Sequence, residues 1–248
     1  MRAFVTGATG FLGGRLTEKL AARGDEVVAL ARRDVSIGGA QVIRGDFDVA
    51  RALSKGAREE ARQRGQTLLV ASSGMHEAEI ELLADNPAGA AETALAAVAA
   101  LEELGEHGWL STVAGWAAEA LYRLGRDDEA WAQTEKAEAA GAADDVITQM
   151  LIRQVRAKIL ARRGEHDEAE RLVREALAFA EPTDMLDATG TAHLDFAVVL
   201  TAAGRREEAA VELAEARGLF AAKGNVVNVA RVDRMLAEQS ASIARLDS

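Results

Sequence analysis

The sequence has no cysteine and, among its 248 residues, only two prolines. The lack of cysteine excludes disulfides, thiolate metal sites and a cysteine nucleophile, and the scarcity of proline permits long helices. Aromatic residues are also rare, at 4%, whereas hydrophobic residues make up 49% of the chain. Alanine must therefore supply much of the core, which favours closely packed helices over a β-sandwich.

Long apolar runs are missing too. No segment approaches the ~20 residues that a membrane-spanning helix needs, and residues 1–5 lead straight into a strand pattern instead of a signal peptide. We therefore expect a cytoplasmic protein that makes no membrane contact. Its four histidines, His76, His107, His166 and His193, form no paired ligand motif, so we predict no metal site.

The charge of the chain is unevenly distributed. Residues 1–48 contain seven Lys/Arg and six Asp/Glu, and because the whole chain carries −11, the remainder carries −12. An acidic surface of this kind repels the phosphates of nucleic acids, which excludes them as expected partners. The change near residue 49 predicts two different pieces, residues 1–48 and 49–248.

The longer piece contains an internal repeat. In four segments a turn residue is followed five residues later by alanine, at spacings of 40, 39 and 40 residues. The turn residues are Asp85, Gly125, Gly164 and Gly204. Two further alanine columns keep the same register, twelve residues before and seven residues after the first column. The three columns are Ala90, Ala130, Ala169, Ala209; Ala78, Ala118, Ala157, Ala197; and Ala97, Ala137, Ala176, Ala216.

Each repeat has the pattern of a helix, a short turn and a second helix. Glycine allows the left-handed residue that ends the first helix, and Asn86 before Pro87 predicts an N-cap followed by a first-turn proline. Alanine where helices cross lets their backbones approach closely. Since a single hairpin cannot cover its own apolar face, we expect the repeats to stack.

These features resemble the tetratricopeptide (TPR) family over residues 50–240, with a period of about 40 in place of ~34. The phrases "ALYRLGRDDEA", "VRAKILARRGEHDEAERLVREAL" and "AEPTDMLDATGTAHLDFAVVLTAAGRREEAA" resemble the helical arrays of actinobacterial signalling ATPases and cyclase-like regulators. The resemblance implies a mainly α protein, a TPR-like superhelix of about 4.5 repeats with a closing helix at 226–246. Residues 51–64 would be the second helix of a leading half-repeat. Residues 67–74 have the local pattern of a strand and a turn, but the repeat register favours a helix there.

The shorter piece has a glycine-rich turn between a predicted strand at 2–7 and a predicted helix at 14–23, followed by predicted strands at 26–31 and 41–44. Strand, glycine turn, helix and strand form the context of a dinucleotide fingerprint. The string "FVTGATGFLGGRL" resembles the extended and atypical short-chain dehydrogenase/reductase family over residues 1–48, which implies a truncated Rossmann lobe. Its cofactor-binding residues would be Gly7, Gly10, Phe11, Leu12, Gly13, Arg32, Arg33 and Asp46.

Arg32 and Arg33 follow the second strand, where two arginines favour the 2′-phosphate of NADP over NAD. An inherited loop that no longer binds a cofactor stays an open alternative. The catalytic pair of that family, a tyrosine with a lysine four residues later, is missing, because Tyr122 is the only tyrosine and position 126 is arginine. We therefore assign no catalytic residue. The incomplete sheet leaves a face and an edge uncovered. A helix at 49–64 would cover one face, and a second copy of the chain would cover the rest.

The array offers a candidate partner-binding surface. Five basic residues, Arg153, Arg156, Lys158, Arg162 and Arg163, occupy the first helix of the third repeat, and first helices line the concave side of such arrays. An acidic peptide or a terminal carboxylate fits this stripe, whereas the alternative is a solvated face paired with Asp144, Asp145 and Glu168. The candidate partner-binding residues are Glu119, Tyr122, Arg153, Arg156, Lys158 and His193. Trp109, Trp116 and Trp131 are interpreted as core residues, with an exposed anchor as the alternative.

The sequence thus leads to three hypotheses. The first is a non-catalytic interaction scaffold that binds a peptide or a partner in its concave groove and retains some NADP(H) binding at its N-terminal lobe. The second is an NAD(P)-dependent epimerase or reductase whose active site another subunit completes. The third is a regulatory remnant whose array serves only to form oligomers.

Overall fold

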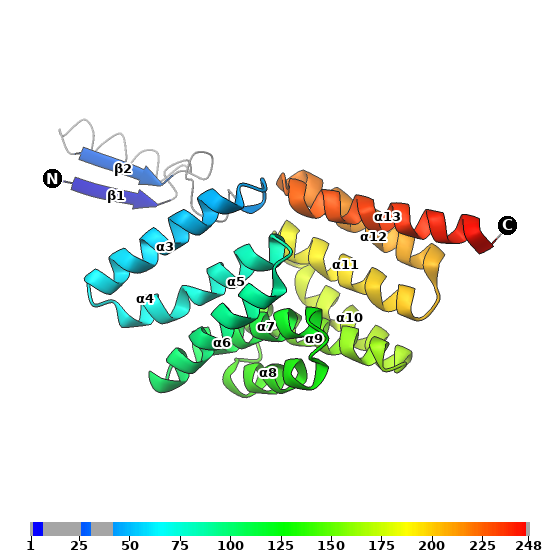
Figure 1. Ribbon diagram of the computed structural model, residues 1–248, viewed down its shortest axis with the longest axis horizontal. Helices are drawn as coiled ribbons and strands as arrows, with labels where there is room; N and C mark the ends of the chain where they lie inside the picture. Colours follow the sequence, from blue (N-terminus) through cyan, green and yellow to red (C-terminus); the bar gives the residue numbers. More distant parts are fainter. Residues whose placement is uncertain (1, 7–25, 31–41, 247–248) are drawn as a thin grey trace.

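The computed structural model describes residues 2–6, 26–30 and 42–246, and in this part of the chain helices dominate (Figure 1). Two short strands, β1 (Arg2–Thr6) and β2 (Glu26–Leu30), pair in parallel, with Arg2 opposite Glu26. The predicted helix at 14–23 and the glycine-rich turn lie outside the described residues. The Rossmann lobe therefore stays a prediction.

The helices follow one another as antiparallel hairpins that fan out in chain order (Figure 1). Helix α3 (Phe47–Gln63) precedes the first hairpin, and α13 (Val226–Leu246) closes the array. The hairpins between them are α4 (Thr67–Ser72) and α5 (Gly74–Leu83) with α6 (Pro87–Glu103), α7 (Gly108–Arg123) with α8 (Asp127–Ala140), α9 (Val146–Arg162) with α10 (His166–Ala180), and α11 (Leu186–Ala202) with α12 (Arg206–Lys223).

The alanine columns of the sequence form the centre of this array. All twelve alanines are buried, eleven of them completely, and Ala97 is 5% exposed. Each is small enough for two helix backbones to approach, while leucines such as Leu121, Leu200 and Leu213 fill the space beside the contact. The predicted stacking of repeats is thus confirmed at the positions that define the repeat.

The turns inside the hairpins also follow the prediction. Gly125, Gly164 and Gly204 have φ values of +74°, +85° and +79°, and Asp85 takes the equivalent conformation at +59°. Aspartate tolerates this left-handed region better than most residues with a side chain. The Asn86 side chain accepts a hydrogen bond of 3.2 Å from the backbone N–H of Gly89, which confirms the predicted N-cap.

The segment with the ambiguous pattern, residues 67–74, is helical: α4 ends at Ser72 and α5 starts at Gly74. Gly74 is required at this junction because a Cβ atom there would lie 2.4 Å from the Cβ of Ala97 on α6. Tertiary packing therefore overrides the strand-like local composition of the segment.

The third predicted strand, at 41–44, is wrong for the residues described, because residues 43–45 form a turn in which the N–H of Gly45 donates to the carbonyl of Val42. The backbone of this segment instead forms hydrogen bonds with the start of α13. The carbonyl of Ile43 accepts hydrogen bonds from Val226 (2.9 Å) and Val227 (3.4 Å) at the start of α13. The segment before α3 thus meets the closing helix, and the two ends of the array lie side by side (Figure 1).

Candidate functional site

The concave side of the array encloses a cavity of about 240 Å³. It is lined by one face of each of α5, α7, α9, α11 and α13, together with Ile43 and Asn225 from the segments that join these helices. This arrangement follows from the repeat, because equivalent helices of successive hairpins lie on the same side of a stacked array. The apolar part of the lining consists of Ile43, Leu82, Leu83, Trp116, Ile147, Met150, Leu151, Val155, Ala188 and Leu194. We call this cavity the concave groove.

A buried ion cluster lies beside the apolar part of the groove. The Nζ atom of Lys158 on α9 lies 2.6 Å from Oε2 of Glu119 on α7 and 2.9 Å from Oδ1 of Asp195 on α11. Its side chain is only 4% exposed. The cluster therefore links the first helices of three successive repeats, and two of its members, Glu119 and Asp195, line the groove.

Arg123 extends this cluster toward the first hairpin. Its Nε atom donates to Oε1 of Glu119 at 2.7 Å, and its Nη1 atom donates to the carbonyl of Leu82 at 2.9 Å. Burial by itself would raise the pKa of Glu119, but Lys158 and Arg123 lower it to about 2. For Asp195 burial prevails over the attraction of Lys158, so its pKa is raised. The pKa values of these two carboxyl groups are thus shifted in opposite directions.

Two polar groups of the groove lack a partner in the described part of the chain. Gln154 on α9 is 3% exposed, and its buried Nε2 atom makes no hydrogen bond. The guanidinium of Arg231 on α13 has no carboxylate within the 4.0 Å that would make an ion pair. Its pKa is lowered by burial and by the neighbouring Arg123, and the carboxylates of Glu119 and Asp195 offset part of this effect. Buried polar groups are normally hydrogen-bonded, and Arg231 is partly buried without a protein partner, so both are candidate ligand contacts.

The predicted basic stripe of α9 does not face the groove. Arg153 donates to Glu175 of α10 at 3.1 Å, and Arg156 donates to Glu138 of α8 at 2.8 Å. Both also lie over aromatic rings of those helices, Phe179 at 4.8 Å and Trp131 at 5.2 Å. The residues of α9 that line the groove are Ile147, Met150, Leu151, Gln154 and Val155, on another side of the helix.

The prediction for the basic stripe is therefore wrong in two respects: which side of the array the residues face, and which acidic residues they pair with. Lys158 is an internal cation, and the arginines stabilise contacts between α9 and its neighbours. Arg162 and Arg163 bond Asp127 and Asp128 of α8, in place of the Asp144, Asp145 and Glu168 that the alternative interpretation proposed; Glu168 pairs with Arg171.

The other predicted partner-binding residues are dispersed. Of the six, only Glu119 lines the groove. Tyr122 is half-buried under the cations of Lys158 and Arg162, whose charged atoms lie 5.1 and 4.1 Å from its ring centroid. The Nδ1 atom of His193 lies 2.7 Å from a carboxylate oxygen of Glu212 on α12. These two side chains thus make contacts within the array.

Two of the three tryptophans are core residues, as predicted, and the third fits the alternative of an exposed anchor. Trp116 and Trp131 pack against the hydrophobic core, and Trp116 also lines the groove. Trp109 is 42% exposed at the start of α7, which contradicts a core role for it. A tryptophan with nearly half of its surface exposed fits the alternative of an exposed anchor.

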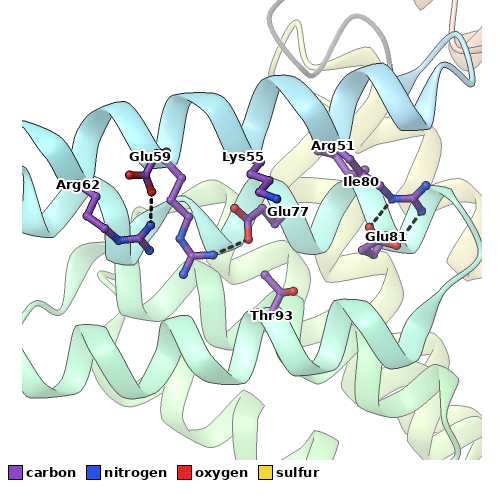
Figure 2. Close-up of a pocket in the computed structure, with 9 residues that line it drawn as sticks. Arg51, Lys55, Glu59, Arg62, Glu77, Ile80, Glu81 and Thr93 are labelled. Carbon is purple, nitrogen blue, oxygen red and sulfur yellow. Dashed lines mark hydrogen bonds and ion pairs between the residues drawn. The ribbon is translucent and has the colours of Figure 1, made fainter.

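A second, wider cleft of about 620 Å³ lies between α3 and α6, with α5 along its side (Figure 2). Arg51 of α3 forms a two-point pair with Glu81 of α5, at 2.6 and 2.9 Å, and Arg58 donates to Glu77 at 2.8 Å. Lys55 lies between these pairs without a carboxylate partner within ion-pair distance in the described residues. The pairs attach α3 to the first hairpin, and we interpret this cleft as structural.

Most predicted cofactor-binding residues, Gly7, Gly10, Phe11, Leu12, Gly13, Arg32 and Arg33, lie outside the described residues. Asp46 is described: it is exposed and directly precedes α3, where its carbonyl accepts a hydrogen bond from Ala50. Within the described ranges no group of three or more His, Asp or Glu side chains is placed to hold a metal ion. Nor does any helix of those ranges combine the length and apolar character needed to cross a membrane.

Sequence reasoning missed Arg231, Gln154 and Asp195. A signal for the ion cluster was present, because Glu119 and Lys158 each follow an alanine of the same column, Ala118 and Ala157. Opposite charges at equivalent positions of neighbouring repeats indicate a contact between repeats. No comparable signal marks Gln154 or Arg231, whose unpaired state depends on what surrounds them in space.

Comparison with solved structures relates the array to TPR-like repeat proteins. The crystal structure of BtubC (BKLC) from P. vanneervenii has a TM-score of 0.53 and 18% sequence identity, over 75% of this chain and 78% of that chain. TPR-like repeats of a kinesin light chain from Podosopora anserina give a TM-score of 0.48 and 18% identity, over 76% of this chain and 93% of theirs. At this identity the first similarity shows the fold alone, a stacked array of helices.

Sequence comparison points to the other end of the chain. Residues 3–100 match the model of the NAD dependent epimerase/dehydratase family, which is less than half of the chain. An uncharacterized protein of Saccharomyces cerevisiae is 39% identical over 66 residues, which are 24% of this chain and 22% of the yeast protein. The chain thus spans only about a fifth of that relative's length. In the structure, the matched segment from residue 47 onward consists of the helices α3 to α6.

Proposed function

We propose that this protein is an interaction scaffold whose concave groove binds a short segment of a partner protein. The observation that carries the proposal is the groove itself, an apolar cavity lined by the inward-facing helices of successive hairpins. The amide nitrogen of Gln154 is buried there without a partner, and the partly buried Arg231 has no ion-pair partner in the described residues. Apolar walls with a few convergent polar groups are typical of binding sites. The TPR-like fold supports this proposal, because stacked helical hairpins form extended concave binding surfaces. The sequence resemblance adds the regulatory arrays of actinobacterial signalling proteins as the proposed context.

The proposal is tested by selecting binders from a random peptide library with the intact chain. The selected peptides are then measured against two variants. Thr191→Phe fills the groove from α11 with a neutral ring, and Val211→Glu alters the outer surface, where Val211 is 61% exposed. We expect Thr191→Phe to weaken binding and Val211→Glu to leave it unchanged. Peptides that bind all three proteins equally, or no selected peptides at all, would refute binding in the groove.

A second function, binding of NADP(H) by a lobe formed by residues 1–48, is favoured by the match of residues 3–100 to the epimerase family model and by the parallel pairing of β1 with β2. Under this proposal the array is a separate unit, residues 49–248. Calorimetric titration of the intact chain with NADPH and NADH is the test, and Arg33→Gln should weaken the binding of NADPH but not of NADH. Absence of heat with both nucleotides would refute nucleotide binding. Turnover of a carbonyl or sugar-nucleotide substrate would favour the enzyme hypothesis.

The two-stranded sheet also supports a proposed contact between copies of the chain, since β1 and β2 pair with no third strand among the described residues. Light scattering coupled to size-exclusion chromatography gives the oligomeric state directly. A monomer at all concentrations would refute this contact.

A further inference from the structure

Arg231 occupies an unusual position in the groove. It lies near a second arginine, Arg123, whose charge Glu119 already neutralises, while Asp195 is paired with Lys158. The carboxylate of Asp85 acts on Arg231 from beyond ion-pair distance. Arg231 itself has neither a hydrogen bond nor an ion pair in the described part of the chain. A largely buried guanidinium without a partner is unfavourable. An anion entering the groove at this point would lower the free energy of the protein by pairing with it.

The side-chain amide of Gln154 provides an independent observation. It lines the same groove, is 97% buried, and has a polar atom without a partner. Leaving such a group unpaired lowers the stability of the folded protein. Since α9 carries apolar residues on the same face, a methionine or leucine would pack there without this cost. The glutamine therefore suits a bound state in which the amide is hydrogen-bonded.

The remaining charges of the groove restrict where an anion can bind. Glu79 and Asp187 also line it, and they lie near each other and near Lys223. Burial, reinforced by Glu79, raises the pKa of Asp187, although the hydrogen bond from Asn225 opposes this. This part of the groove repels a carboxylate. The groove thus contains Arg231, which favours an anion, and the carboxylates of Glu79 and Asp187, which disfavour one, so we expect an anion to bind only where it pairs with Arg231.

We propose that the Arg231 region of the concave groove binds an acidic side chain of a partner peptide, while the Gln154 amide hydrogen-bonds the peptide and Met150, Leu151 and Val155 contact an adjacent apolar side chain. This proposal rests on the proposed scaffold function and specifies its ligand. A guanidinium suits a carboxylate because it donates two parallel hydrogen bonds. The volume of the groove, about 240 Å³, limits the inserted part of the peptide to a few side chains.

The test uses decapeptides that are acetylated and amidated, so that the only carboxylate is a central Glu. Matched sets carry Gln or Lys at that position, and the flanking positions sample Ala, Val, Leu and Phe. Binding to the intact chain is measured by fluorescence polarisation. We expect the Glu set to bind at least about tenfold more tightly than the Gln set, the size of effect that one charge-assisted hydrogen bond gives.

Three variants assign the effect to its residues. Arg231→Gln should remove the preference for Glu, whereas Arg234→Gln, an exposed arginine of the same helix that does not line the groove, should leave it unchanged. Gln154→Met should weaken peptide binding and at the same time leave the melting temperature equal or higher, since it removes an unpaired buried amide. A merely structural Gln154 would instead lower the melting temperature on substitution.

The outcomes separate this inference from the proposed function. If Glu and Gln peptides bind equally well and Thr191→Phe still prevents binding, the groove is a peptide site and the carboxylate inference is wrong. If Gln peptides with a free C-terminus bind more tightly than the capped Glu set, a terminal carboxylate occupies the site and the assignment to a side chain is wrong. If none of the peptides binds to the wild-type chain, both proposals fail.

Discussion

Replacing Lys158 with methionine should destabilise the fold by about 3–5 kcal/mol near neutral pH, the range found when one partner of a buried ion pair is removed. Methionine retains the length and apolar stem of the side chain, so little packing is lost. Asp195, which is 5% exposed, loses its ion-pair partner, and Glu119 keeps only Arg123. For a chain of this size the change corresponds to a fall in melting temperature of roughly 10 °C.

The assay is urea unfolding followed by circular dichroism, with Lys136→Met as the matched control. Lys136 pairs with Glu102 on the surface, where 33% and 45% of the two side chains are exposed, and such pairs contribute about 0–1 kcal/mol. The double variant Lys158→Met/Asp195→Leu should recover much of the loss, since it removes the isolated carboxylate and leaves Glu119 bonded to Arg123.

The pH dependence of this variant has a definite sign. The folded-state pKa of Asp195 is raised above its ordinary value of 3.8 by burial, and the removal of Lys158 raises it further. A folded state that binds the proton more tightly gains stability as the pH falls, so the loss caused by Lys158→Met should be smaller at about pH 5 than at about pH 7. Glu119, with a pKa of about 2 in the wild type, opposes this trend only as the pH falls through its unfolded-state value of 4.5. A cost below about 1 kcal/mol near neutrality would refute a buried, energetically important cluster.

Three further predictions concern the array. Ala176→Leu should destabilise it by about 1–3 kcal/mol, because it overpacks a completely buried point where helices cross. The control Ala178→Leu, on the exposed side of α10, should change the stability little. Equal melting temperatures of the two variants would contradict the role of the alanine columns. Asn86→Ala should cost about 1 kcal/mol in chemical denaturation through loss of the N-cap, and no change would mean that water replaces it. Gly164→Ala should destabilise the fold by about 1–2 kcal/mol, because Gly164 has a φ of +85°. Its control, Gly56→Ala on the exposed side of α3, should stabilise the fold by up to about 1 kcal/mol. If thermal melts show the same sign for both variants, the conformational argument is wrong.

The repeat was predictable from sequence because its signal is local and recurs. A left-handed turn residue, an alanine five positions later and apolar residues at helical spacing each have one structural meaning, and repetition at about 40 residues separates them from chance. The closing helix at 226–246 was predicted with the bounds that the structure shows. The predicted strand at 41–44 was wrong, because the carbonyl of Ile43 bonds to a helix that starts 183 positions later in the chain, which no local pattern reveals.

The helical array, its register and its turns follow from the amino-acid sequence alone, because they depend on backbone conformation and on side-chain size at fixed spacing. Which charges are available to a partner follows only from the packing of the helices. The sequence predicted a basic stripe of five residues, of which four lie in α9 and Arg163 directly follows it. Four of the five bond acidic residues of α8 and α10, and Lys158 is enclosed by Glu119 and Asp195. No sequence pattern marks Arg231, and yet it is the arginine of the groove that has no partner in the described part of the chain. Whether a charge is neutralised depends on groups about 3 Å away in space, and for this basic stripe most of them come from another repeat.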